Sequence, residues 1–173
     1  MFKVKNKLTE EIVQVLDTYC DGYGKTWFLF WIKDKWTWRS ADFYVPPNYI
    51  IKKKVIITGS RTFQNYPFLC NELDKIREQI GEVVCGEAKG AETLGRIYAY
   101  DNNIKIKSFP ADWQTYGQRA VMIRNEDMAD YADLLIVFLD EQNLDTQDII
   151  TKMERLGKKV NIIYYNQPHE KED

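Results

Sequence analysis

The sequence predicts an α/β protein in which a doubly wound parallel sheet follows a small β-rich module. Between residues 54 and 164, apolar strand patterns alternate with helical patterns, as in a parallel sheet with helices on both faces. Before residue 50, short β-branched and aromatic runs are separated by turn residues. We therefore expect a β-rich module over residues 1–49, an α/β domain over residues 50–165 and a polar tail over residues 166–173.

The N-terminal module carries the pattern of short antiparallel strands. Thr26–Ile32 is almost wholly apolar and aromatic, which predicts a strand covered on both faces. Lys33–Lys35 is a polar hairpin tip, and Trp36–Arg39 alternates as a returning strand should. Pro46 and Pro47 close the unit because proline cannot continue a ladder. We expect a small SH3-like barrel or meander.

Four of the five tryptophans lie in this module. One interpretation is an aromatic platform for a peptide, a base or a nucleotide. The other is that the rings fill the barrel and its interface with the next domain. We favour the second interpretation, because about 45 residues make a small core that needs every apolar side chain.

The α/β domain is expected to contain five strands and four helices. The strands are expected at Lys54–Thr58, Glu82–Gly86, Ile104–Phe109, Leu134–Leu139 and Lys159–Tyr164. The helices are expected at Tyr66–Ile80 with Gly81 as its C-cap, from about Lys89 to Asn102, at Gln118–Tyr131 and at Asp145–Leu156.

Composition excludes several classes of protein. The net charge of −2 argues against a general nucleic-acid coat, and no apolar run approaches the roughly 20 residues that span a bilayer. Three widely spaced cysteines and the lack of a signal-peptide core favour free thiols and a cytoplasmic location. The only histidine, His169, lies in the polar tail, so histidine-based catalysis and a zinc site are not expected. We expect no resident metal or cofactor.

The first strand of the domain ends in a candidate phosphate loop. Gly59 and Ser60 follow four apolar or β-branched residues, and a helical pattern begins shortly afterwards. At the carboxyl edge of an open sheet such a turn can bring backbone N–H groups close to a phosphate. Arg61 adds a fixed fork of donors.

Three further loops fall on the same edge. The second contains Gly86, Lys89 and Gly90, with Glu92 placed to meet a ribose hydroxyl. The third contains Asp112 and two rings, Trp113 and Tyr116, that could hold a base. The fourth is Asp140–Thr146, and Arg124 with Asn125 lies on a nearby helical stretch where both could reach phosphate or ribose.

Each of these features also has an ordinary structural explanation. Gly59 could serve only a tight turn, Trp113 could cap the core, and Arg124 could pair with Glu126 or Asp127 on the surface. Neither glycine loop is a Walker A or a GxGxxG motif. Their common placement at the ligand-binding edge of one sheet is the stronger argument for a nucleotide site.

The motifs that carry a family resemblance occur in order along the chain. They are Val55–Phe63, Gly86–Glu92, Phe109–Trp113, Arg124–Met128 and Ala132–Asp133. This set resembles the SLOG superfamily of Rossmann-like domains, which includes relatives of the DNA-processing protein Smf/DprA and the LOG phosphoribohydrolases. The YspA-related group of bacteria and phages is the most similar branch. The resemblance covers about residues 54–164.

The resemblance implies binding of a nucleotide or a nucleotide-derived ligand. It assigns ligand or phosphate contacts to the matching positions, which are Gly59, Ser60, Arg61, Gly86, Gly90, Glu92, Arg124 and Asn125. We add Lys89 and Thr146, from the second and fourth loops, as further candidates for ligand or phosphate contacts. Some members of the superfamily cleave a base from a ribose phosphate, and others sense ADP-ribose-like signals in antiphage defence. SLOG domains commonly pair through their helices, so the resemblance also implies a homo-oligomer.

The fourth loop departs from the pattern of the family. Relatives usually carry a glycine-rich loop there, whereas Glu141 and Asp145 replace both glycines with acids that repel a phosphate. In the LOG hydrolases a glutamate follows three residues after the threonine, and the matching position here is Ile149. Asp148 is one step away and would face elsewhere on a helix. Hydrolysis is therefore in doubt, while binding is not.

Three hypotheses about function follow. The first is non-catalytic sensing or sequestration of a nucleotide-derived signal, such as an ADP-ribose-type or cyclic nucleotide, for example as a phage anti-defence sponge. The second is a phosphoribohydrolase that acts on a nucleoside monophosphate. The third is DprA-like binding of single-stranded DNA, against which the acidic balance of charge argues. We favour the first, with a small-molecule partner and without nucleic acid or membrane.

Overall fold

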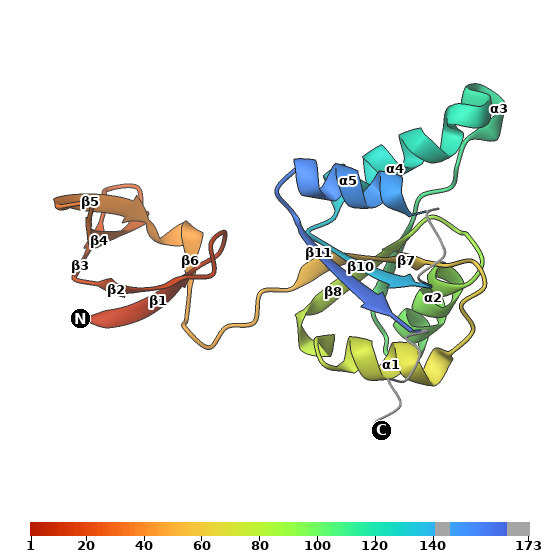
Figure 1. Ribbon diagram of the computed structural model, residues 1–173. Coiled ribbons are helices and arrows are strands. Elements are labelled where there is room, and N and C mark those ends of the chain that lie inside the picture. Colours follow the sequence, from red (N-terminus) through yellow and green to blue (C-terminus); the bar gives the residue numbers. More distant parts are fainter. Residues whose placement is uncertain (141–145, 166–173) are drawn as a thin grey trace, which may run out of the picture. The chain divides into compact units, whose positions relative to one another are not determined.

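The structure is a computed structural model of the chain and describes residues 1–140 and 146–165. The expectations for residues 141–145 and for the polar tail at 166–173 lie outside the described residues. The chain divides into two compact units, Met1–Ile51 and Lys52–Asp173 (Figure 1). The N-terminal unit is β-rich and the second unit is an α/β domain, as the sequence predicts.

The N-terminal unit consists of two three-stranded antiparallel sheets with the strand orders β2-β1-β6 and β3-β4-β5. Its elements are β1 (Phe2–Asn6), β2 (Ile12–Val15), β3 (Asp17–Cys20), β4 (Thr26–Ile32), β5 (Lys35–Ser40), the 3₁₀ helix η1 (Ala41–Phe43) and β6 (Tyr44–Val45). At the β4–β5 hairpin, Lys33 and Asp34 have φ values of 48° and 59°. These left-handed conformations match the right-handed twist of the two strands.

The small core of this unit contains Val4, Val15, Phe30 and Tyr44 but no tryptophan. In β4, Phe28, Phe30 and Ile32 pack toward this core, whereas the alternate residues point to the opposite face of the sheet. Trp31 is therefore 52% exposed, so the expectation of a strand covered on both faces is wrong.

The residues opposite this core form an aromatic sheet surface. We call this surface the tryptophan face, and it contains Tyr19, Trp27, Trp31, Trp36 and Trp38. Trp31 and Trp36 are cross-strand partners with ring centroids 4.8 Å apart, and the Tyr19 and Trp38 centroids are 6.2 Å apart. Since Trp31, Trp36 and Trp38 are exposed, the expectation that they fill the barrel is wrong.

The second unit contains a five-stranded parallel sheet with the order β11-β10-β7-β8-β9. Its strands are β7 (Lys53–Gly59), β8 (Ile80–Cys85), β9 (Lys105–Ser108), β10 (Leu134–Leu139) and β11 (Lys159–Tyr164). The six residues of β10 are all buried, as expected for a central strand of such a sheet. This is the Rossmann-like doubly wound arrangement that the alternating pattern predicts.

Helices cover both faces of this sheet (Figure 1). On one face α1 (Tyr66–Asp74) and α2 (Ala91–Asp101) bury Leu69, Leu73 and Tyr98. On the other face α4 (Ala120–Tyr131) and α5 (Gln147–Arg155) bury Met128, Ile149 and Met153. Short helices complete the unit: η2 (Arg77–Gln79), α3 (Trp113–Tyr116) and η3 (Gly117–Arg119).

Two predicted helices have different bounds in the structure. The helix expected over Tyr66–Ile80 ends at Asp74, and Gly81 lies inside β8 instead of capping a helix. Ile80 is the first residue of β8, where it pairs with Lys53 and is buried, so sheet pairing overrides the helical period. The helix expected from Gln118 begins at Ala120, after α3 and η3.

In the part of the chain that the structure describes, no helix has both the length and the hydropathy needed to span a bilayer.

Candidate functional site

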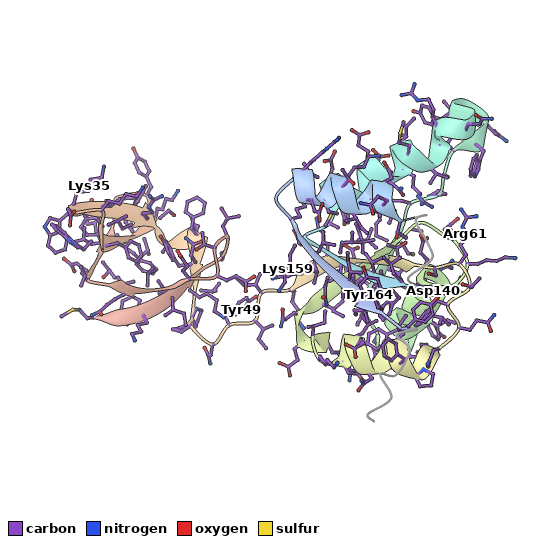
Figure 2. The ribbon with its side chains drawn as sticks, viewed as in Figure 1. Lys35, Tyr49, Arg61, Asp140, Lys159 and Tyr164 are labelled. Carbon is purple, nitrogen blue, oxygen red and sulfur yellow. The ribbon has the colours of Figure 1, made fainter. Side chains whose placement is uncertain are left out.

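A cavity of about 500 Å³ opens at the carboxyl edge of the parallel sheet. Figure 2 shows Arg61 and Asp140 toward the end of the sheet marked by Tyr164, away from the end marked by Lys159. The lining residues come from the end of β7, the loops after β7, β8 and β9, the start of α2, and α3, α4 and α5 with the residue that precedes α5. They are Thr58, Gly59, Arg61, Gly86, Glu87, Ala88, Lys89, Glu92, Ala111, Trp113, Val121, Arg124, Asn125, Thr146 and Ile149.

The first loop is held by close backbone packing. Gly59 has φ +151°, and a Cβ atom there would lie 2.0 Å from the carbonyl oxygen of Phe138 in β10. The Ser60 N–H donates to that same oxygen at 2.9 Å. The Ser60 hydroxyl accepts from the Asp140 N–H at 3.1 Å, and Ser60 is fully buried. Ser60 therefore joins the ends of two strands and does not line the cavity.

The second loop packs directly on the first. Gly90 has φ +76°, and a Cβ atom there would lie 2.2 Å from the Ser60 carbonyl oxygen. The Ala91 N–H donates to that oxygen at 3.4 Å. Gly90 is therefore needed for the contact between the two loops, and it lies outside the cavity lining.

Glu92 fixes the second loop from inside. Its Oε2 accepts from the N–H groups of Gly86 at 2.9 Å and Ala88 at 2.8 Å, and its Oε1 accepts from the Thr58 hydroxyl at 3.0 Å. The side chain is only 4% exposed. Through these three bonds Glu92 stabilises the second loop, in addition to the ribose contact that the sequence predicts for it.

Three backbone N–H groups of the glycine loops take part in bonds within the protein. The N–H groups of Ser60, Gly86 and Ala88 already donate to acceptors within the protein. The glycines allow the chain segments to approach one another, and these three N–H groups stabilise the loops.

The opposite wall carries Arg124 and Asn125 on α4. The Arg124 Nη1 donates to the Gly86 carbonyl at 2.8 Å, and a Cβ atom at Gly86 would lie 2.4 Å from that nitrogen. The Arg124 Nε and Nη2 both donate to the Asn125 Oδ1, at 3.2 Å and 2.8 Å. Because Gly86 has no side chain, the Arg124 guanidinium can lie against the backbone of the second loop.

Thr146 and Ile149 bring the start of α5 to the cavity. Thr146 is 6% exposed, and its hydroxyl has no hydrogen-bond partner within residues 1–140 and 146–165. A buried hydroxyl without a partner costs about 1–3 kcal/mol, which a ligand could recover. Ile149 is a lining residue at the position where the hydrolases carry their glutamate, so this part of the wall is apolar.

The third loop contributes one of its two rings. Trp113 lines the cavity and is 60% exposed, whereas Tyr116 is half-exposed and outside the lining. Asp112 caps α3 by accepting from the Thr115 N–H at 3.0 Å. The Thr115 hydroxyl, and after it the Thr115 N–H, hold the pKa of the Asp112 carboxyl below its usual value.

The charges of the lining favour an anion. Arg61, Lys89 and Arg124 are cationic, Glu87 and Glu92 are acidic, and Glu92 is already paired with three donors. The described residues include no cluster of three or more histidine, cysteine or acidic side chains that could hold a metal ion.

Sequence reasoning missed several lining residues. Thr58 could have been found, since it is the polar end of an apolar strand. Val121 lies three residues before Arg124, which places both on one face of α4. Glu87, Ala88 and Ala111 carry no chemical signal beyond their position in the loops.

Comparison with known proteins supports the expected resemblance. Residues 53–116 match the family described as YspA, cpYpsA-related SLOG. The fold is similar to that of DNA processing protein A (DprA) from Streptococcus pneumoniae, with a TM-score of 0.56 and 15% sequence identity. That match covers 69% of this chain and 52% of the DprA chain, so this chain corresponds to about half of that protein. A search of curated proteins finds no match.

Proposed function

We propose, from the SLOG match of residues 53–116 and the cavity beside it, that this protein binds a phosphorylated, nucleotide-derived small molecule without cleaving it. The observation that carries the proposal is the composition of the cavity. Three cationic side chains and the Thr146 hydroxyl, which has no partner among the described residues, meet an apolar wall at Ile149.

The cavity suits such a ligand in size and chemistry. A volume of about 500 Å³ lies within the roughly 300–1,000 Å³ of small-molecule sites. Arg61, Lys89 and Arg124 would hold phosphate oxygens, while Trp113 offers a ring on which a base can stack. An ADP-ribose-type or cyclic nucleotide signal contains both groups. Binding without turnover would serve to sense or to sequester it, in a cell or on behalf of a phage.

Two features of the cavity argue against hydrolysis. Cleavage of a bond between base and ribose develops positive charge on the sugar, which a nearby carboxylate stabilises. The position that carries this carboxylate in the LOG hydrolases holds Ile149, and the carboxylate of Glu92 is bonded to the second loop. We therefore place the phosphoribohydrolase hypothesis second.

Equilibrium dialysis tests binding directly. The purified protein is dialysed against AMP, ADP-ribose and its cyclic isomers, and cyclic dinucleotides, with adenosine as the control that lacks a phosphate. We expect at least one phosphorylated compound to bind and adenosine to bind at least about tenfold more weakly. The proposal is wrong if none of them binds, or if Arg61→Ala and Arg124→Ala both leave binding unchanged.

The same samples decide between binding and turnover. Chromatography of AMP incubated with a high concentration of protein should return AMP without free adenine. Release of adenine that Arg124→Ala abolishes would support the hydrolase hypothesis instead. Mass spectrometry of small molecules released by denaturing the protein would identify a ligand that copurifies.

Binding of single-stranded DNA is a further candidate, because the similar structure belongs to a DNA-processing protein. The net charge of −2 argues against it, since binding to the phosphate backbone normally requires a basic surface. A gel shift with a dT30 oligonucleotide at low salt should show no complex. A complex that persists at 150 mM salt would favour this candidate.

A further inference from the structure

A chain of polar side chains leads from α5 to the cavity. Asn125, which is 5% exposed, donates from Nδ2 to the Asp148 carboxylate at 2.9 Å. Lys152, one turn further along α5, donates to the same Asp148 oxygen at 3.0 Å and to the Met122 carbonyl at 2.7 Å. On its other side, the Asn125 Oδ1 accepts two bonds from Arg124.

The chemistry of the two neighbours allows only one orientation of the Asn125 amide. A guanidinium has donors and no acceptor, whereas an ionised carboxylate has acceptors and no donor. An amide between them satisfies both only when its oxygen faces Arg124 and its nitrogen faces Asp148. The opposite orientation would place donor against donor and acceptor against acceptor.

This arrangement holds the guanidinium in a defined pose. Of the five N–H donors of an arginine side chain, three are used in bonds to Asn125 and Gly86. Nη1 and Nη2 of Arg124 therefore each keep one N–H that these three bonds do not use. Arg124 also lines the cavity. N–H groups of a guanidinium donate strong hydrogen bonds to the oxygens of a phosphate or carboxylate.

We infer that Asp148 is a positioning residue for the anion site, acting through Asn125 to set the pose of Arg124. This inference rests on the proposed function, because the pose of Arg124 affects binding only if an anionic ligand binds in the cavity. Asp148 itself does not line the cavity, so its contribution is through Asn125.

Asp148 can affect the affinity for an anion in two ways. Because the two ways predict opposite changes in affinity when Asp148 is removed, an experiment can distinguish them. As a nearby negative charge, Asp148 weakens the binding of an anion, so its removal should strengthen binding. As a positioning residue it strengthens binding, so its removal should weaken it. Asp148→Ala and Asp148→Asn remove the same charge, but only asparagine keeps an acceptor for Asn125 and Lys152.

The experiment measures AMP binding by equilibrium dialysis for the wild type, Asp148→Ala, Asp148→Asn and Arg124→Ala. We expect Asp148→Ala to weaken binding about tenfold, as loss of an orienting partner does in other sites. Asp148→Asn should stay within about threefold of the wild type. Glu154→Ala, which removes an exposed acid from the same helix, is the matched control and should change nothing.

A second measurement needs no ligand. The Arg124 Nε–H bond to Asn125 should give a slowly exchanging signal in a proton–nitrogen NMR spectrum, assigned by its loss in Arg124→Ala. We expect the signal in the wild type and Asp148→Asn, and its loss or broadening in Asp148→Ala. Because the Asp148 side chain is 41% exposed, Asp148→Ala should fold, and Asp148→Ser repeats the test if it does not.

The outcomes separate the two proposals. If the wild type binds neither AMP nor any other tested nucleotide, the proposed function fails, and the NMR signal alone decides the role of Asp148. If AMP binds and Arg124→Ala abolishes binding, the inference is overturned when Asp148→Ala binds as tightly as the wild type or more tightly. Equal weakening in Asp148→Ala and Asp148→Asn also overturns it, because keeping an acceptor for Asn125 would then make no difference to binding.

Discussion

On the side of the cavity formed by the loops after β7 and β8, the buried polar groups bond to one another and only the side chains of Arg61 and Lys89 are proposed to meet a ligand. On the other side, α4 and α5 keep bonding capacity for a ligand. The Glu92 carboxylate and the Ser60 hydroxyl on the loop side are bonded within the protein. On the helix side, Arg124 keeps donors and the Thr146 hydroxyl has no partner in the described part of the chain. A polar residue near a cavity can therefore either stabilise the protein around the cavity or bind a ligand. The hydrogen bonds that the residue makes within the protein distinguish these two roles.

The largest expected effect is on the loop side, at Gly59. Gly59→Ala should lower the free energy of unfolding by about 3 kcal/mol or more, because the new Cβ meets the Phe138 carbonyl and the φ is strained. Urea denaturation followed by circular dichroism measures the change. Gly117→Ala, with φ +51° and no atom within 4 Å of the new Cβ, is the control and should cost about 1 kcal/mol. Equal losses at the two sites would show that the close packing does not matter.

Glu92 should come next, again as a loss of stability. Glu92→Ala leaves the N–H groups of Gly86 and Ala88 and the Thr58 hydroxyl without their acceptor, which should cost about 2–4 kcal/mol. Glu92→Gln keeps one acceptor oxygen and should lose about half as much. Thermal melts of both variants, with Glu126→Ala as the exposed control, test this order. If Glu92→Ala were as stable as the wild type, Glu92 would belong with the ligand-binding groups.

Thr146 tests the helix side, where stability and binding should move in opposite directions. Thr146→Val replaces a hydroxyl that has no partner within residues 1–140 and 146–165 with a methyl group of similar size, so the free energy of unfolding should rise by about 0.5–1 kcal/mol. AMP binding should weaken about tenfold if the hydroxyl serves the ligand. A stabilised variant with unchanged affinity would remove Thr146 from the site.

The smallest effect concerns the reactivity of Cys85, directly beneath the second loop. Burial raises the pKa of its thiol above the ordinary value of 9.0, so the folded protein should keep the thiol protonated and unreactive. A thiol reagent at pH 8 should label exposed Cys20 quickly and Cys85 only on unfolding. Unfolding lowers the thiol pKa, so stability should fall as the pH rises past 9. Rapid labelling of Cys85 would mean that the loop opens freely.

The sequence predicted the parts of the fold that depend on apolar pattern. Leu134–Leu139 occupies the predicted strand because a continuous apolar run is typical of a strand buried on both faces. Lys159–Tyr164 also forms the predicted strand, at the edge of the sheet beside β10. The end of α1 was missed, because the spacing of Ile76 and Ile80 fits both a helix and the start of a buried strand. The exposed tryptophans were also misjudged, since composition does not say which face of a strand meets the core.

For the candidate site, the sequence indicated which residues gather at the edge but not how they bond. Gly59, Arg61, Gly86, Lys89 and Arg124 were all expected there and all line the cavity. The roles of Ser60 and Gly90 in joining the two loops depend on distances between segments that are far apart in sequence. The bond between Asn125 and Asp148 depends in the same way on how α4 packs against α5.

The lack of a side chain at Gly86 has a consequence for how this chain can change by mutation. Any larger residue at position 86 would occupy the space of the Arg124 guanidinium, so the two positions constrain each other. A substitution at Gly86 would displace the guanidinium from this pose or require a smaller residue at position 124, and either change abandons the anion contact. Variation at these two positions should therefore be coupled, with glycine at 86 accompanying arginine at 124 wherever the contact is in use.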